Sequence, residues 1–168
     1  VQKGKQSGTS NIGLVNGGAA TNVVPDSLHV RAECRSHNPK FRAKIVDAYR
    51  KAFERAAKAV KSAGGETGRI AFTVRDKYES FSIPASEPAV NAAVAAVEAE
   101  GRAPMTRIVN GGLDANWLTL HGFPTVTLGC GQNGIHTVNE TLDIEDYWAA
   151  CRIALRLATA RGMDSPSE

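Results

Sequence analysis

The segment from Asn38 to Gly65 limits the fold most, because it predicts one long amphipathic helix between two strands. Asparagine at the N-cap followed by proline at the first helical position, as in Asn38-Pro39, is typical of a helix start. Apolar residues then recur at helical spacing, while charged residues occupy the other side. The expected inward positions are Phe41, Ile45, Tyr49, Ala52, Phe53, Ala56 and Val60. Gly64-Gly65 is expected to end the helix.

Three stretches around this helix have the pattern of strands. Residues 11–18 form a short apolar run that stops at two glycines, and residues 69–83 form a longer one. In residues 28–35, apolar and polar residues alternate with the period of a strand that buries one face. The expected buried residues there are Leu28, Val30, Ala32 and Cys34. So small a sheet with one covering helix would leave apolar surface exposed, which predicts an incomplete α+β sandwich.

A second region begins at 84–88, where the composition changes. Helix and strand signals then alternate, which is typical of an α/β layer. We expect helices at 88–100, at 114–121 and from Asp143 or Asp146 through Arg161, with strands at 104–110 and 125–131. The expected inward residues of the last helix are Tyr147, Trp148, Cys151, Leu155 and Ala158. The tail GMDSPSE is expected to lack regular structure.

Charge and cysteine content exclude several classes of protein. The 20 basic and 17 acidic residues give a net charge of +3 and form no run of like charges, so a nucleic-acid-binding surface is not indicated. No apolar run approaches the length of a membrane span. The three cysteines are widely spaced and form no C-x-x-C pair, which argues against a disulfide framework or a cysteine zinc site. A reducing cytoplasm fits this composition best.

The glycine-rich run at 129–134 formally matches G-x-G-x-x-G, the dinucleotide fingerprint. In a dinucleotide fold a helix should follow at once, whereas IHTVNETL intervenes here. A nucleotide-binding oxidoreductase is therefore an alternative, but the sequence lacks the helix that should follow the glycines. The glycines would equally let the backbone approach a ligand or metal. Neither G-x-S-x-G nor H-E-x-x-H occurs, so a serine-hydrolase elbow and a zincin helix are unsupported.

Several polar residues lie where the predicted strands end or turn, and each has a structural alternative. His136 follows a strand in a turn, so it is either a metal ligand or a structural histidine. Glu140 would orient the His136 ring or be a solvated turn residue. Asp114 would serve the site or be a helix N-cap, and Asn22 has turn formation as its default role. Arg35 would be solvated or would bind a carboxylate through its planar guanidinium.

Three stretches together resemble one family. They are GGAATNVVPDSLHVRAECR at 17–35, GGLDAN at 111–116 and GFPTVTLGCGQNGIHTVNE at 122–140. They are similar, in order and spacing, to the di-zinc peptidases that include peptidase T, aminoacylase, carboxypeptidase G and succinyl-diaminopimelate desuccinylase. The resemblance is strongest to the peptidase T-like branch and runs over nearly the whole chain.

This resemblance implies an α/β catalytic domain that binds two zinc ions and carries a ferredoxin-like α+β lid, which mediates homodimerisation. Residues 1–84 would be part of the lid, and 85–168 the C-terminal part of the catalytic domain. His136 matches the last zinc ligand of the family. Asn22 and Arg35 match lid residues that reach substrate, often across the dimer, and Gly112 matches a loop whose backbone lines the substrate pocket.

The implied reaction is hydrolysis of a peptide or an N-acyl amino acid. Zinc would activate a bridging water, a glutamate would take its proton, and the hydroxide would attack the amide carbonyl. Arg35 and Asn22 would fix the substrate and the tetrahedral oxyanion. The His-x-Asp motif, the paired glutamates and the lid histidine of the family do not occur in this chain.

The missing motifs predict that the chain is the C-terminal portion of a longer enzyme and is inactive alone, with no catalytic base of its own. A single histidine cannot hold two zinc ions, which together need several ligands. The alternative is a binding or dimerisation module that keeps the family architecture without catalysis.

Overall fold

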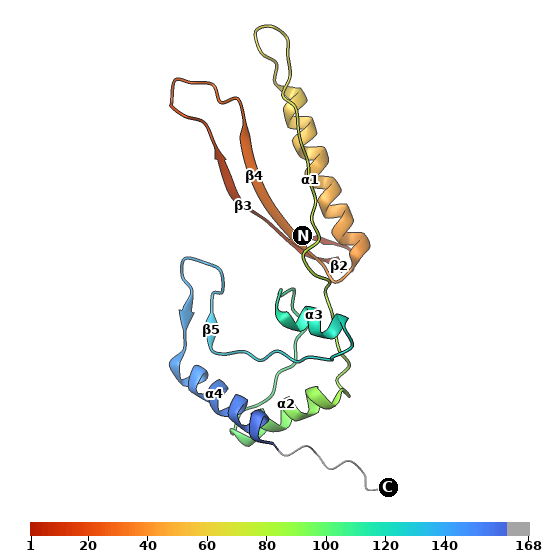
Figure 1. Ribbon diagram of the computed structural model, residues 1–168, viewed down its shortest axis with the longest axis vertical. Helices are drawn as coiled ribbons and strands as arrows, with labels where there is room; N and C mark the ends of the chain where they lie inside the picture. The colour runs from red at the N-terminus through yellow and green to blue at the C-terminus, as the bar shows by residue number, and fades with distance from the viewer. Residues whose placement is uncertain (161–168) are drawn as a thin grey trace. The chain divides into compact units, whose positions relative to one another are not determined.

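The computed structural model describes residues 1–160, and the chain falls into two compact units, Val1–Ser80 and a second that begins at Phe81 (Figure 1). The first unit contains strands β1 (Gln2–Lys3), β2 (Gln6–Ser7), β3 (Thr9–Gly17) and β4 (Leu28–Arg35), followed by helix α1 (Pro39–Ala59). The second contains helices α2 (Pro88–Ala99), α3 (Asp114–Leu120) and α4 (Ile144–Thr159), with strands β5 (Gln132–Asn133) and β6 (Thr141–Leu142). The mixed α/β content agrees with the sequence-based prediction.

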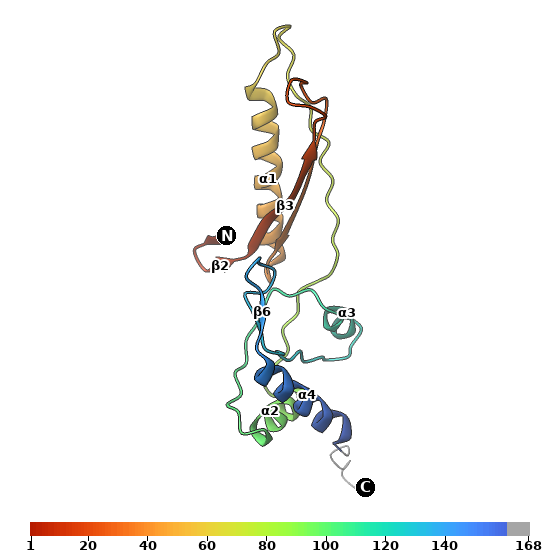
Figure 2. The same ribbon diagram turned by 90° about the vertical axis from the view of Figure 1, so that its left-hand side faces the viewer.

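The main sheet of the first unit is the antiparallel hairpin β3–β4. Its register pairs Thr9 with Arg35 at one end and Gly17 with Leu28 at the other, with a bulge between Ile12 and Leu14. Both strands were predicted, β4 from its alternation and β3 from a short apolar run that stops at two glycines. The hairpin and α1 start from a common base, where β4 passes into the helix (Figures 1 and 2).

Helix α1 begins as predicted and ends earlier than predicted. The Asn38 Oδ1 accepts the Phe41 N–H at 3.1 Å, which confirms the N-cap. The helix ends at Ala59 rather than at Gly64. Beyond it the chain makes a tight turn, in which the Ser62 N–H donates to the Glu66 carbonyl at 2.8 Å. This hydrogen bond satisfies backbone groups that would otherwise have to pair within a longer helix.

The core of the first unit lies at its base. Phe41 and Ile45 are buried there, and Ser36 is 1% exposed, with its Oγ donating to the Ser7 carbonyl at 2.7 Å. A Cβ added at Gly8 would lie 2.5 Å from the carbonyl oxygen of Arg35, so this approach requires glycine.

Away from the base, the predicted buried faces are wrong or only half right. Of the expected strand positions, Val30 and Cys34 are half-buried, whereas Leu28 and Ala32 are exposed. Of the inward positions predicted for α1, Ala52, Ala56 and Val60 are exposed. The reason is that the hairpin and the helix converge only at the base, so away from it neither covers the other (Figures 1 and 2).

Residues 69–83 form no strand, contrary to the prediction. Residues 68–79 instead follow α1 in the opposite direction. The Gly68 N–H donates to the Ala57 carbonyl at 3.1 Å, and the Arg42 guanidinium bonds both carboxylate oxygens of Glu79 at 3.1 and 3.2 Å. Between them, the Arg50 guanidinium lies 4.4 Å from the centroid of the Phe72 ring. Side-chain contacts to the helix therefore replace a backbone ladder.

The three predicted helices of the second unit are all present, and glycines end two of them as expected. Gly101 has φ 70° after α2, and Gly122 has φ 87° after α3. After α3 the Phe123 N–H donates to the Leu118 carbonyl at 2.9 Å, and the Gly122 N–H donates to Thr119 at 3.1 Å. These are the two hydrogen bonds of a Schellman motif, which needs a left-handed residue.

Helices α2 and α4 pack against each other and form the core of the second unit. The buried residues are Ala93, Ala96, Ala149 and Ile153. The predicted inward face of α4 is therefore wrong, because Tyr147, Trp148, Cys151, Leu155 and Ala158 are all exposed. Small alanines on both helices let the two backbones approach, so the contact forms there and the larger side chains point away.

The strands predicted at 104–110 and 125–131 are absent among the described residues, where the unit has only β5 and β6. A strand exists only where a neighbour accepts its hydrogen bonds, and no described segment pairs with these two. Arg161 and the tail GMDSPSE lie outside the described residues. No helix within 1–160 has the length and apolarity that crossing a bilayer requires.

Candidate functional site

The candidate metal ligand His136 lies in the loop that joins β5 and β6. These strands pair Gln132 with Leu142 and Asn133 with Thr141. Within residues 1–160, His136 is the only non-glycine residue with a positive φ, at 65°. The left-handed conformation costs a residue with a Cβ about 1–2 kcal/mol. The surrounding loop must therefore hold it in place.

Two side chains organise this loop. The Glu140 Oε2 accepts the backbone N–H of His136 at 2.6 Å, and its Oε1 accepts from the Gln132 Nε2 at 3.3 Å. The Thr137 hydroxyl donates to the Gly134 carbonyl at 2.7 Å. Glu140 was predicted to orient the His136 ring; the structure places its carboxylate on the backbone N–H, and a role toward the ring stays a prediction.

Gly131 ties the loop to the start of α4. Its carbonyl accepts the Asp143 N–H at 2.8 Å, and Asp143 caps the helix by accepting the Asp146 N–H at 2.9 Å. Gly131 has φ 85°, and an added Cβ would lie 2.6 Å from the Asp143 carbonyl oxygen. The glycine is thus explained by backbone approach rather than by a phosphate. A loop and strand β6, not a helix, follow Gly134, so the dinucleotide context is absent.

The loop before α3 carries Gly112 and Asp114. Gly112 is exposed in the bend that leads into the helix. Asp114 was predicted as the N-cap, but the N-cap is Leu113, and Asp114 is the first helical residue, where its charge favours the helix dipole. The Leu113 N–H donates to the Asn116 Oδ1 at 2.8 Å, and Asn116 is buried. Sequence reasoning missed Asn116, although its place three residues after the N-cap is that of the second residue of a capping box.

The two predicted substrate residues of the first unit lie at opposite ends of β4. Asn22 is exposed in the loop that joins β3 to β4. Arg35 is the last residue of β4 and is half-buried. From Leu28 to Arg35 the strand rises about 23 Å, at roughly 3.3 Å per residue. Asn22 and Arg35 of one chain therefore cannot contact one small substrate together.

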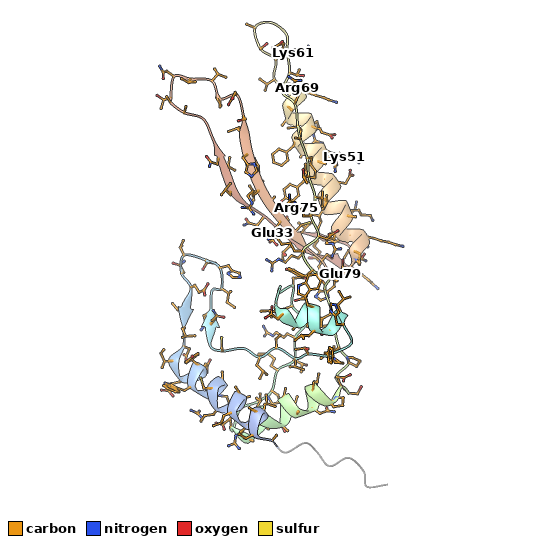
Figure 3. All side chains as sticks on the ribbon, in the orientation of Figure 1. Glu33, Lys51, Lys61, Arg69, Arg75 and Glu79 are labelled. Carbon is orange, nitrogen blue, oxygen red and sulfur yellow. The ribbon has the colours of Figure 1, made fainter. Side chains whose placement is uncertain are left out.

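Arg35 is held by a neighbouring acid. Its Nε bonds the Glu33 Oε2 at 2.5 Å (Glu33 is labelled in Figure 3), and this hydrogen bond raises the pKa of Arg35 above its already high ordinary value. The guanidinium is always charged, and a substrate carboxylate would have to share it with Glu33 or displace Glu33.

A zinc site needs more ligands than these residues provide. Throughout residues 1–160, no group of three or more His, Cys, Asp or Glu side chains lies close enough to hold a metal ion. Protein zinc sites take at least three such ligands. The described residues therefore do not fit two zinc ions by themselves, and His136 is a single candidate ligand that needs partners from elsewhere.

Comparison with known proteins decides the family. The model of peptidase family M20/M25/M40 matches residues 3–160. The chain belongs to this family. Aminopeptidase PepT from Bacillus cereus ATCC 10987 is 33% identical, with a TM-score of 0.60 over 89% of this chain and 39% of PepT. A tripeptidase from Staphylococcus aureus subsp. aureus Mu50 is 32% identical, with a TM-score of 0.66 over the same shares.

A further relative of this M20/M25/M40 family chain is the uncharacterized protein YqjE of Bacillus subtilis (strain 168). It is 36% identical over 138 residues, which are 82% of this chain and 36% of YqjE. The chain thus spans less than two fifths of the length of all three relatives. The predicted resemblance to the peptidase T-like branch is confirmed, and so is the mixed α/β fold. The roles of the individual site residues stay predictions.

Proposed function

We propose that this chain is the C-terminal portion of a zinc-dependent peptidase that hydrolyses a peptide or N-acyl amino acid bond in the cytoplasm. The observation that carries the proposal is the family match over 3–160, within which His136 is the one described non-glycine residue held in a left-handed conformation. Residues 1–84 act as the lid and dimerisation part, and 85–168 as part of the catalytic domain.

Each site residue has a role that its chemistry supports. A neutral imidazole nitrogen of His136 would ligate zinc, which, when bound, supplies a Lewis acid and lowers the pKa of a bound water. The Arg35 guanidinium would hold a substrate carboxylate in a bidentate pair, and Asn22 would donate to a substrate oxygen. The exposed backbone at Gly112 would line the pocket.

The separation of Asn22 and Arg35 along β4 supports a homodimer. If both residues bind substrate, they must serve two different active sites. A homodimer joined through the lid would contain two such sites. The general base and the remaining zinc ligands come from outside this chain, so the chain alone is inactive.

The test begins with the codons upstream of Val1, which must encode a His-x-Asp motif and a Glu-Glu pair. The protein expressed from its whole gene is then assayed for zinc content and for hydrolysis of di- and tripeptides, with His136→Ala beside it. The matched control is His29→Ala, an exposed histidine of β4. We expect His136→Ala to lose zinc and most activity, and the control to keep both. Undiminished zinc in His136→Ala would remove the ligand assignment.

The alternative is a binding or dimerisation module without catalysis. The observation that favours it is that the residues described here contain no group able to hold a metal ion. Upstream codons without the two motifs, together with a protein that dimerises but binds no zinc, would establish this alternative.

A further inference from the structure

We propose that Glu140 and Gln132 form a backbone clamp that keeps His136 in its left-handed conformation. The Glu140–Gln132 clamp rests on the proposed function, because a ligand role gives the direction of the His136 ring a purpose. Neither residue is a catalytic residue in this proposal. Both are positioning residues that act through the backbone of His136.

The geometry uses both oxygens of the Glu140 carboxylate. Oε2 accepts the His136 N–H at 2.6 Å, and Oε1 accepts the Gln132 Nε2–H at 3.3 Å. The first distance is that of a short, charge-assisted hydrogen bond. Gln132 is itself fixed, because it lies in β5 and pairs with Leu142 of β6. The carboxylate therefore links the unpaired part of the loop to a paired strand.

The other hydrogen bonds of the loop do not reach His136. The Thr137 N–H donates to the Gly134 carbonyl at 3.1 Å, and the Glu140 N–H donates to the Thr137 carbonyl at 3.2 Å. The first closes the turn 134–137, in which His136 is the third residue and a positive φ belongs to the turn type, and the second closes the neighbouring turn 137–140. Relaxation to a negative φ would redirect the Cα–Cβ bond of His136, and with it the imidazole. The contact to Glu140 opposes this relaxation through the N–H of His136 itself, in addition to the closure of the turn.

The clamp requires a hydrogen-bonding side chain at position 140. A glutamine there loses the charge but can still accept the His136 N–H through its oxygen and donate its NH2 to the Gln132 oxygen once that amide turns over, so Glu140→Ala, not Glu140→Gln, removes the clamp. Exchanging the two side chains preserves the pattern. With Gln132→Glu and Glu140→Gln together, the amide at 140 accepts from His136 through its oxygen and donates to the new carboxylate at 132.

The test measures amide hydrogen exchange at His136 by NMR in the metal-free chain. Glu140→Ala and Gln132→Glu are each expected to speed exchange roughly 10- to 100-fold, the range for losing a hydrogen bond to a charged acceptor, because the first removes the acceptor and the second places two carboxylates opposite each other. Both should weaken the strong amide-to-α-proton NOE within His136 that marks a positive φ. The double exchange should restore both signals. Val138→Ala, an exposed neighbour, should change neither, and the Ile153 amide of α4 reports that the unit stays folded.

Zinc affinity of the protein expressed from its whole gene is the second readout. Each single variant should weaken it about 10- to 100-fold, as for other residues that orient a metal ligand, and the double exchange should recover it. Unchanged exchange at His136 in both single variants overturns the clamp. So does a double exchange that behaves like the single variants, or a zinc affinity that none of them alters. Retention of zinc by His136→Ala instead removes the proposed function and leaves the exchange result standing.

Discussion

The two units of this protein hold their chain segments by different means. In the first, β3 and β4 pair along their whole length, and the base is closed by the buried Ser36 and by the close approach of Gly8 to Arg35. In the second, order comes from the packing of α2 on α4, and the longest strands have two residues. The comparison shows that an alternating apolar pattern becomes a strand only when the same unit also supplies its partner.

Charge separates the units as well. Residues 1–80 contain 15 Lys and Arg against 7 Asp and Glu, whereas residues 81–168 contain 5 against 10. Figure 3 labels four of the basic side chains of the first unit, Lys51, Lys61, Arg69 and Arg75. The modest net charge of the chain conceals this difference, because the two parts cancel. A first unit of this composition would attract anionic groups.

The largest effect is expected from Phe41→Ala. Phe41 is 3% exposed at the base of the first unit, and removing a buried phenylalanine costs about 3–5 kcal/mol. Urea unfolding followed by far-UV circular dichroism should show the loss of α1 at lower urea. Both tryptophans, Trp117 and Trp148, belong to the second unit, so the transition seen by fluorescence should not move.

Val60→Ala is the control for Phe41→Ala, because Val60 is 74% exposed and its truncation should stay within about 0.5 kcal/mol. A fluorescence transition that shifts together with the circular dichroism would mean that the two units unfold as one. The two units would then not be stabilised separately.

Gly131→Ala should have the next largest effect, and in the second unit. The added Cβ meets the backbone of Asp143 and Tyr147 and requires a positive φ, so we expect about 2–4 kcal/mol of destabilisation. Here tryptophan fluorescence should report the loss. Gly129→Ala is a close control, because nothing lies within 4 Å of its added Cβ. Equal stability of the two variants would contradict the role given to Gly131.

The smallest effect is expected from Glu100→Gln, which tests the ion pairs between α2 and α4. The Glu100 carboxylate bonds the Nε atoms of Arg152 and Arg156 at 2.7 and 2.5 Å. These hydrogen bonds lower the pKa of Glu100 below its ordinary value of 4.5. Since the folded pKa is depressed, the stabilisation is fully present above pH 4.5 and is lost as the pH falls through the folded pKa.

Thermal unfolding of wild type and Glu100→Gln across this pH range provides the measurement. The wild type should be more stable at neutral pH, and the difference should vanish in acid. Glu98→Gln, on the same helix but without a described ion pair, should follow the wild type. A difference between wild type and Glu100→Gln that persists unchanged in acid would show that packing, not charge, accounts for it.

The local features of the sequence were enough to place most elements. Asn38-Pro39 predicted the start of α1, Gly101 and Gly122 predicted two helix ends, an apolar run before glycines predicted β3, and alternation predicted β4. These signals succeed because capping bonds, left-handed glycines and strand alternation depend on residues close in sequence. His136 was singled out differently, by the family resemblance and by its place after the run at 125–131, which is not a strand in the structure, and its role stays a prediction.

Contacts between distant residues were decided only by the tertiary structure. The run at 69–83 has a strand pattern, yet it follows α1, where Arg42 bonds Glu79 and Arg50 lies over the Phe72 ring, instead of pairing with the β3–β4 hairpin. Helix α4 turns Ala149 and Ile153 inward rather than its aromatic residues, because α2 offers a surface of alanines. Likewise, Glu140 could be named from sequence, but its bond to the backbone of His136 depends on the β5–β6 register that brings Gln132 beside it.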